Sequence, residues 1–218
     1  ASSETVFSPE IVRYKTLEDG DSLALHIFKP RNMQAGEKRP AIVYFFGGGW
    51  KLGTPIQFYR ECAYYASKGM VAVSVDYRIG YLHHSTPFES FEDAKDAICW
   101  LRSHASDYQL DPDKIAVAGG SAGGHLAAAL GTIGSDETVP AGYRPNLSVL
   151  YYPVIDMVSR GYGFPEIKRD FEKISPIHHV SEATPSTLIL LGTKDPIVSV
   201  ETLSLIHISE PTRPRLIS

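Results

Sequence analysis

Short, continuously apolar stretches alternate along the chain with longer stretches whose apolar residues recur at helical spacing. Ala41–Phe46 and Met70–Val75 are apolar throughout, as strands buried on both faces of a sheet are. Phe88–His104 instead repeats its apolar residues every three or four positions, which is typical of an amphipathic helix. This alternation predicts an α/β fold with a mostly parallel central sheet and helices on both faces.

The same pattern places the remaining elements. Ile11–Thr16 and Leu23–Phe28 are expected to pair as an antiparallel hairpin. We further expect strands and helices, in chain order, at Gln57–Lys68 (helix), Lys114–Ala118 (strand), His125–Leu130 (helix), Leu147–Tyr152 (strand) and Thr187–Leu191 (strand). Residues 153–186 are interrupted by proline and glycine and are expected to form a cap-like insertion. Residues 1–202 then make a single domain, because no repeat or linker-like segment divides them.

Composition narrows the classes of function. The chain has 218 residues and a formal net charge of −4 without clusters of basic residues, which argues against nucleic-acid binding. No apolar run is long enough to span a membrane, and no signal peptide is visible, so we expect a protein that is cytoplasmic or exported after removal of a leader. Cys62 and Cys99 are expected to be buried free thiols. No metal-ligand spacing is present, and no cofactor is expected.

A serine between glycines carries the strongest chemical signal. Gly119–Gly123 matches the pattern G-x-S-x-G and lies directly after an apolar strand and directly before a helix. Such a sharp turn strains the backbone of Ser121, and small residues two positions before and after it avoid clashes. Ser121 is therefore the candidate nucleophile, and the N–H of Ala122, at the positive end of a helix, is a candidate donor to an oxyanion. The alternative is a glycine turn that only packs a helix on a strand.

Two further motifs fit the same chemistry. Three glycines, including Gly48 and Gly49, follow the strand Ala41–Phe46 and can present free backbone N–H groups as the second half of an oxyanion hole. Trp50, directly after them, is a candidate for the substrate pocket. Asp195 follows the last apolar strand, where a carboxylate could orient a histidine; the alternative there is an ordinary turn before a proline.

Together these motifs resemble the α/β-hydrolase family, and within it the branch of hormone-sensitive-lipase-like enzymes and of acetyl xylan and feruloyl esterases. The matching stretches are FFGGGW (45–50), VDYR (75–78), DPDKIAVAGGSAGGHLAA (111–128), YYPVIDM (151–157), SPIHHV (175–180) and GTKDPIV (192–198). The resemblance covers about residues 20–202 and implies an α/β-hydrolase fold with Ser121 as nucleophile and Asp195 as triad acid. Phe46 stands where the branch commonly has histidine, and Gly120 where it commonly has aspartate.

The triad histidine is the weakest part of this interpretation. In this fold it follows the acid, and His207 is the only histidine after Asp195. Twelve positions are too few for the helix and strand expected between them, so the spacing argues against His207 as the base. His83 and His84 lie in a predicted loop near the mouth of the site and are candidate substrate contacts, whereas His125 is expected to pack beneath the nucleophile turn.

The end of the chain has an unusual sequence. Residues 203–218 show no helical or strand pattern and resemble the translated read-through of a sequencing adapter. On this interpretation the natural sequence stops near Thr202, and the last strand, the triad histidine and the last helix of the fold are missing. Thr187–Leu191 would then be an exposed edge strand, which favours pairing with a second copy of the chain.

The sequence therefore predicts a serine esterase that acts on small acyl esters, either small molecules or polysaccharides. Acetyl groups on plant polysaccharide are the substrate that the family resemblance implies. The alternative is a truncated hydrolase-like protein that lacks the triad histidine and turns over little, because the oxyanion hole alone supplies only part of the catalysis.

Overall fold

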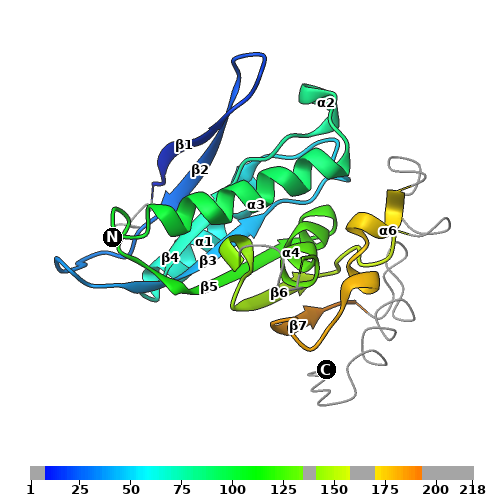
Figure 1. The fold of residues 1–218 in the computed structure, drawn as a ribbon. Coiled ribbons are helices and arrows are strands. Elements are labelled where there is room, and N and C mark those ends of the chain that lie inside the picture. The colour runs from blue at the N-terminus through cyan, green and yellow to red at the C-terminus, as the bar shows by residue number, and fades with distance from the viewer. Residues whose placement is uncertain (1–7, 135–140, 158–169, 193–218) are drawn as a thin grey trace.

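The computed structural model describes residues 8–134, 141–157 and 170–192. Its seven strands form one sheet in the order β1-β2-β4-β3-β5-β6-β7. The strands are β1 (Glu10–Thr16), β2 (Ser22–Phe28), β3 (Arg39–Phe45), β4 (Val71–Val75), β5 (Leu110–Gly120), β6 (Leu147–Tyr151) and β7 (Ser186–Leu190). β1 and β2 pair antiparallel with each other and β2 pairs antiparallel with β4, whereas β3 to β7 are parallel (Figure 1). The predicted hairpin and the mostly parallel sheet are confirmed.

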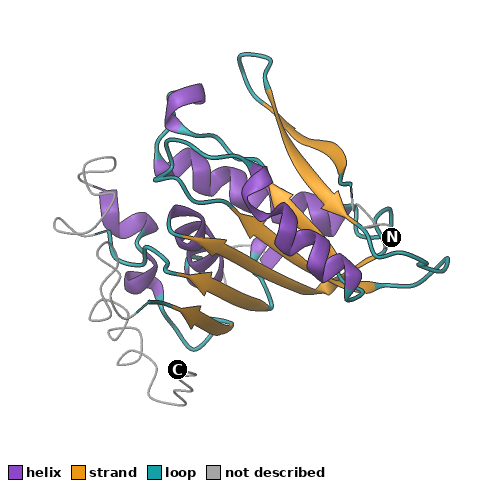
Figure 2. Cartoon of the chain, turned by 180° about the vertical axis from the view of Figure 1, so that it is seen from behind, coloured by secondary structure: helices purple, strands orange, loops and turns teal. Residues whose placement is uncertain are grey.

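Helices cover both faces of the sheet. The longer ones are α1 (Tyr59–Ser67), α3 (Pro87–Ser103) and α4 (Ala122–Thr132). Figures 1 and 2, seen from opposite sides, show α1 on one face and α3 and α4 on the other. The start of α3 is fixed by a capping box, in which Thr86 and Glu89 satisfy backbone N–H groups that the first turn leaves without partners.

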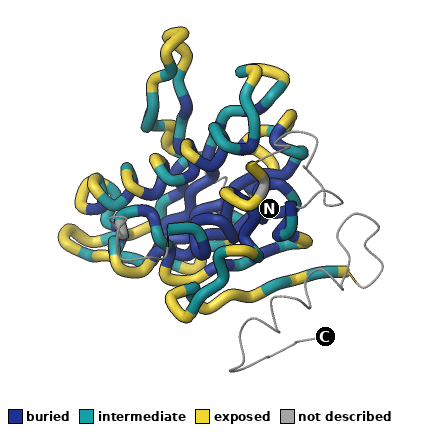
Figure 3. Tube along the Cα trace, turned by 45° about the vertical axis from the view of Figure 1, so that its right-hand side comes forward, coloured by how far each residue is buried: buried dark blue, intermediate teal, exposed yellow. Residues whose placement is uncertain are grey.

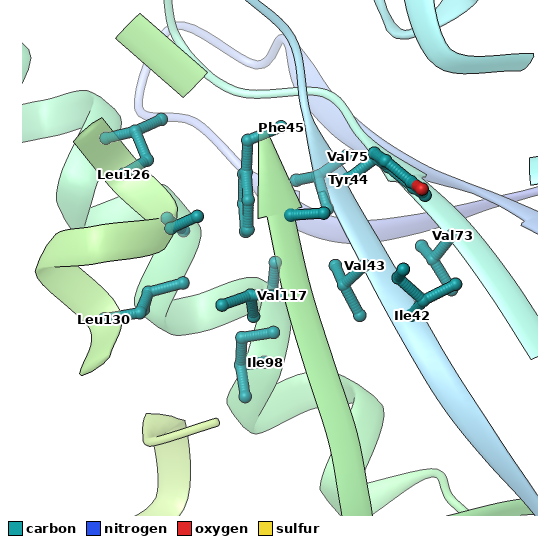
Figure 4. Packing of buried hydrophobic residues seen from close by; sticks show 14 of the residues in the cluster. Ile42, Val43, Tyr44, Phe45, Val73, Val75, Ile98, Val117, Leu126 and Leu130 are labelled. Carbon is teal, nitrogen blue, oxygen red and sulfur yellow. The ribbon is translucent and has the colours of Figure 1, made fainter. Parts of the chain in front are cut away.

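The core lies where the central strands meet these helices. β4 is buried at all five positions, and β3 is buried from Ala41 to Phe45 because it has a strand on each side and helices on both faces. Figure 4 shows Ile98 of α3 and Leu130 of α4 beside Val117 of β5. On the opposite face, Tyr44 stacks on Phe58 with ring centroids 4.8 Å apart. The continuously apolar sequence of these strands follows from burial on both faces.

Short helices connect the main elements. They are η1 (Pro55–Phe58), α2 (Gly80–His83), η2 (Ala141–Tyr143), α6 (Phe171–Ile174) and η4 (Pro176–His179). The last two lie in the predicted cap-like insertion, of which residues 158–169 are outside the described part. The single-domain boundary at 202 and the tail from 203 also lie outside it, so both stay predictions.

Three expectations need correction. His83 lies in the short helix α2 rather than in a loop, because the sequence around it has no apolar repeat that would reveal one helical turn. The helix predicted from Gln57 begins at Tyr59, after a 3-10 turn. Cys99 is exposed, since it lies on the outer side of α3, whereas Cys62 is buried as expected. Within the described ranges, no helix is both long and apolar enough to cross a membrane.

Candidate active site

Ser121 lies at the turn from β5 to α4, with backbone angles φ 54° and ψ −118°. A positive φ costs a residue other than glycine on the order of 1–3 kcal/mol, so surrounding contacts must hold it. The Ser121 N–H donates to the carbonyl of Tyr151 at 3.1 Å, and its own carbonyl accepts from His125 at 2.9 Å and Val154 at 3.3 Å. Three backbone hydrogen bonds therefore fix the strained residue from two sides.

Two glycines make this turn sterically feasible. A Cβ on Gly119 would lie 2.3 Å from the carbonyl oxygen of Gly123, and a Cβ on Gly123 would lie 2.0 Å from that of Phe45. Both obstacles are backbone atoms, which cannot move aside as a flexible side chain can. The expectation that the positions two before and two after Ser121 must be small is confirmed.

The glycine loop, residues 47–53, runs beside this turn. A Cβ on Gly47 would lie 3.4 Å from the Cβ of Ser121. Gly48 and Gly49 have φ values of 140° and 62°, and a Cβ on Gly48 would lie 2.0 Å from the carbonyl oxygen of Leu52. The Gly47 N–H donates to Gln57 Oε1 at 2.6 Å. Among the described residues, no acceptor is recorded for the N–H groups of Gly48 and Gly49, nor for that of Ala122 at the start of α4.

Buried aromatic side chains hold the glycine loop in place. The hydroxyl of Tyr77 donates to the carbonyl of Phe46 at 2.6 Å, and the two rings stack with centroids 4.1 Å apart. Trp50 is 1% exposed, and its indole N–H donates to Nδ1 of His125 at 3.3 Å. Trp50 therefore holds the loop in place, and its predicted contact with a substrate stays a prediction.

His125 packs beneath the nucleophile turn, as the sequence predicted, and both of its ring nitrogens are engaged. Nδ1 accepts from Trp50, and Nε2 donates to the carbonyl of Ile174 at 2.6 Å. Complete burial lowers the pKa of His125 to about 4, so its ring is neutral near pH 7. A base must have a free nitrogen facing the nucleophile, and His125 has none; it instead ties α4 to the glycine loop and to α6.

The helix α2 links the glycine loop to the N-terminal hairpin. The Gly80 N–H donates to the carbonyl of Trp50 at 2.8 Å, and the Tyr81 N–H to that of Lys51 at 3.0 Å. Nδ1 of His83 accepts from the N–H of Ile79 at 3.0 Å, and its Nε2 lies 3.8 Å from Asp21 Oδ2. His84 ends the helix in a left-handed conformation with φ 52°. The contacts of His83 and His84 with a substrate stay predictions.

The other triad residues lie outside the described part of the chain. Asp195 comes five residues after the end of β7, and His207 comes later still. β5 and β7 are parallel and flank β6, so Ser121 and the segment after β7 leave the sheet at the same carboxyl edge. Asp195 as acid and His207 as base stay predictions.

The sequence predicted no role for the residues of the VDYR (75–78) and YYPVIDM (151–157) stretches, two of which lie near the site. Burial raises the pKa of Asp76, just after β4, to about 6, and the nearby His83 partly opposes this shift. Tyr152, just after β6, places its phenol ring against Gly120. Asp76 and Tyr152 could have been singled out from the sequence because each directly follows a predicted strand, at the carboxyl edge of the sheet where ligands bind in such folds. No group of three or more metal-binding side chains occurs within the described residues.

Comparisons with known proteins agree on one family. Residues 25–163 match the family model described as BD-FAE. Esterase LipC of Mycobacterium tuberculosis is 29% identical over 214 residues, covering 84% of this chain and 51% of its own length. An acetylxylan esterase of Xylanibacter ruminicola is 26% identical over 201 residues, covering 85% of this chain and 39% of its own. The chain thus spans about half or less of these curated relatives.

Solved structures of one esterase give the same result. Thermogutta terrifontis esterase 2, phosphoramylated by tabun, is 35% identical and superposes with a TM-score of 0.86, covering 97% of this chain and 81% of that one. The butyrate-bound form of the same esterase gives 35% identity and a TM-score of 0.85, with 94% and 79% covered. The fold is that of the α/β hydrolases, and the chain belongs to the BD-FAE family.

Proposed function

We propose that this protein is a carboxylic ester hydrolase whose nucleophile is Ser121. The observation that carries the proposal is the strained backbone of Ser121, which three backbone hydrogen bonds hold beside a loop in which the N–H groups of Gly48 and Gly49 have no acceptor among the described residues. A strained residue that a structure holds this firmly is a recurrent feature of catalytic sites. The esterase names of the relatives support the same reaction class.

In the proposed reaction, the Oγ of Ser121 attacks the carbonyl carbon of the ester while a histidine base takes its proton. The oxyanion that forms accepts hydrogen bonds from the N–H groups of Gly48, Gly49 and Ala122. Removal of one such donor typically costs about 100- to 1,000-fold in kcat, so these amides carry much of the rate. The base returns the proton to the leaving alcohol, and water then releases the acid from the acyl-enzyme.

Short acyl groups are the proposed substrates. The relatives include a protein named acetylxylan esterase and an esterase solved with bound butyrate. We therefore propose acetyl to butyryl esters, with acetylated polysaccharide as one natural form. The similar Thermogutta terrifontis esterase 2, which tabun phosphoramylates, supports a nucleophile that attacks electrophilic centres such as the carbonyl carbon of an ester.

The test is hydrolysis of p-nitrophenyl acetate by the parent and by Ser121→Ala. The proposal predicts a loss of at least about 1,000-fold in kcat/KM, because the variant has no nucleophile. Thr132→Val, a change at the far end of α4, is the matched control and should keep the parent's rate. Equal rates for the parent and Ser121→Ala would remove Ser121 from the mechanism.

The variant His207→Ala distinguishes a chain with a complete triad from a chain that lacks the triad base. A further loss similar to that of Ser121→Ala would make His207 the base in spite of its short spacing from Asp195. A parent that is slow, and is not slowed further by His207→Ala, would instead favour a hydrolase-like chain that relies on its oxyanion hole.

A further inference from the structure

The glycine loop cannot set the direction of its own N–H groups. Its first three residues are glycines, which adopt many backbone conformations at similar energy. Gly48 and Gly49 both lie at positive φ and have no side chain that could pack and hold them. The direction of their N–H groups therefore depends on what holds the peptide that begins the loop, between Phe46 and Gly47.

Both polar groups of this first peptide are bonded to side chains. Its carbonyl, from Phe46, accepts from the hydroxyl of Tyr77 at 2.6 Å, and its N–H, from Gly47, donates to Oε1 of Gln57 at 2.6 Å. The carbonyl and the N–H of a trans peptide lie in one plane and point in opposite directions. A peptide that is held at both groups cannot rotate about the chain, so its plane is fixed.

The two side chains come from different elements that are themselves held in place. Tyr77, after β4, is fully buried and stacks on the ring of Phe46. Gln57 lies on η1, where the carbonyl of Pro55 accepts from the buried hydroxyl of Ser74 at 2.7 Å. Gln57 is itself exposed, so water could replace it as acceptor and the bond adds little to stability. Its larger effect is on the direction of the peptide.

The held peptide lies directly against the proposed nucleophile. A Cβ on Gly47 would lie 2.9 Å from the carbonyl oxygen of Gly120, 3.4 Å from the Cβ of Ser121 and 3.6 Å from Oε1 of Gln57. The Gln57 oxygen and Ser121 therefore border the same small space. The next two N–H groups along the chain are the proposed donors to the oxyanion, and rotation of the held peptide would redirect them. A misplacement of about 1 Å at a catalytic site can cost about 100-fold in rate.

Resting on the proposed function, we propose that Gln57 is a positioning residue for the oxyanion hole and that it acts together with Tyr77. The two side chains fix the plane of the peptide before Gly48, so the N–H groups of Gly48 and Gly49 meet the oxyanion without first having to turn. Donors that are already oriented need no rearrangement during the reaction. Gln57 acts through the backbone and not on the substrate, so its effect falls on kcat rather than on KM.

The kinetics of Gln57→Ala and Tyr77→Phe with p-nitrophenyl acetate test this proposal. Each variant removes one of the two hydrogen bonds, and Tyr77→Phe keeps the aromatic ring that stacks on Phe46. We expect each variant to lower kcat about 10-fold and to leave KM within about 2-fold of the parent. The reason is that a misdirected donor weakens binding of the transition state but not of the substrate.

Each variant has a matched control. Ile56→Ala changes an exposed side chain on the same short helix as Gln57. Tyr143→Phe removes a hydroxyl that donates to the carbonyl of Ile133 at 2.9 Å, at the far end of α4. Both controls should keep the parent's kcat, even where the unfolding midpoint of Tyr143→Phe falls. An unchanged kcat in Gln57→Ala or in Tyr77→Phe, or an equal loss in a variant and its control, would overturn the proposal.

Amide hydrogen exchange, followed by NMR, tests the bond of Gln57 without turnover. In Gln57→Ala the Gly47 N–H loses its acceptor, so its exchange should speed up at least about 10-fold, whereas Ile56→Ala should leave it unchanged. Gln57→Glu keeps an acceptor oxygen, so the exchange should stay slow. Exchange at the parent's rate in Gln57→Ala would mean that the peptide is not held there, against the proposal.

The two measurements distinguish this proposal from the proposed function. A parent that hydrolyses no ester but shows the expected exchange pattern would refute the hydrolysis and support the hold of Gln57 on the Gly47 peptide. An active parent whose kcat does not fall in Gln57→Ala would refute the positioning role alone.

Discussion

The central strands of the parallel sheet and its edge strand β7 give the site very different support. β3 and β5, which lead into the glycine loop and Ser121, have a strand on each side and are buried toward their carboxyl ends. β7, which leads toward Asp195, pairs with β6 alone among the described strands and is exposed at four of five positions (Figure 3). The nucleophile and its amide donors therefore rest on the most rigid part of the fold, and the proposed acid follows the least supported strand.

The most direct test of this contrast adds one methyl group after the central strand β5 and one after the edge strand β7. Gly123→Ala would press a Cβ to within 2.0 Å of the carbonyl oxygen of Phe45, while Gly192→Ala, just after β7, would meet nothing within 4 Å. Although alanine favours a helix by about 1 kcal/mol, the clash with backbone outweighs it, and we expect Gly123→Ala to lose at least about 3 kcal/mol of unfolding free energy.

Urea denaturation measures both variants. Gly192→Ala should stay within about 0.5 kcal/mol of the parent, as surface substitutions usually do. Similar midpoints for the two variants would contradict the claim that the two strand ends differ in support.

A pH titration tests the link that His125 makes beneath the nucleophile. The unfolded chain binds a proton at this histidine below about pH 6.5, whereas the folded chain does so only below about pH 4. Stability is therefore lost as the pH falls through this window, by about 3 kcal/mol for this one group. In His125→Gln the amide can still accept from Trp50 and donate to Ile174, but it does not titrate.

The free energy of unfolding of both proteins should be compared from pH 7 to pH 4. The advantage of the parent over His125→Gln should shrink steadily as the pH is lowered. A difference that stays constant across the range would show that His125 is not buried in its neutral form.

The smallest expected effect on stability concerns the edge strand. Leu188 on β7 is 40% exposed, so Leu188→Lys should change the unfolding free energy by less than about 0.5 kcal/mol. A charged residue blocks strand pairing, so the variant should remain monomeric if the parent self-associates through β7, as the sequence predicts. Light scattering after gel filtration would contradict this edge contact if the parent and the variant eluted alike at every concentration.

Much of the fold and of the nucleophile turn could be predicted from the local sequence. The glycine spacing around Ser121 predicted the turn because a sharp strand-to-helix turn needs small residues beside it, although the atom that a Cβ on Gly123 would meet belongs to Phe45 on a distant strand. The apolar strands predicted the sheet because burial on both faces leaves them no polar positions. The bridge from Trp50 through His125 to Ile174 was not predictable, since it joins residues 75 and 49 positions apart. The contact of the Tyr152 ring with Gly120 was missed for a similar reason, because only the fold brings these two residues together.

The central claim is that the fold holds the half-buried Ser121 as the nucleophile, and covalent labelling tests it most directly. The parent and Ser121→Ala are treated with a fluorophosphonate, and the modified peptide is identified by mass spectrometry. We expect one phosphonyl group on Ser121 of the parent and none on the variant. A parent that stays unlabelled, or that is labelled at another residue while Ser121→Ala hydrolyses esters at the parent's rate, would contradict the account.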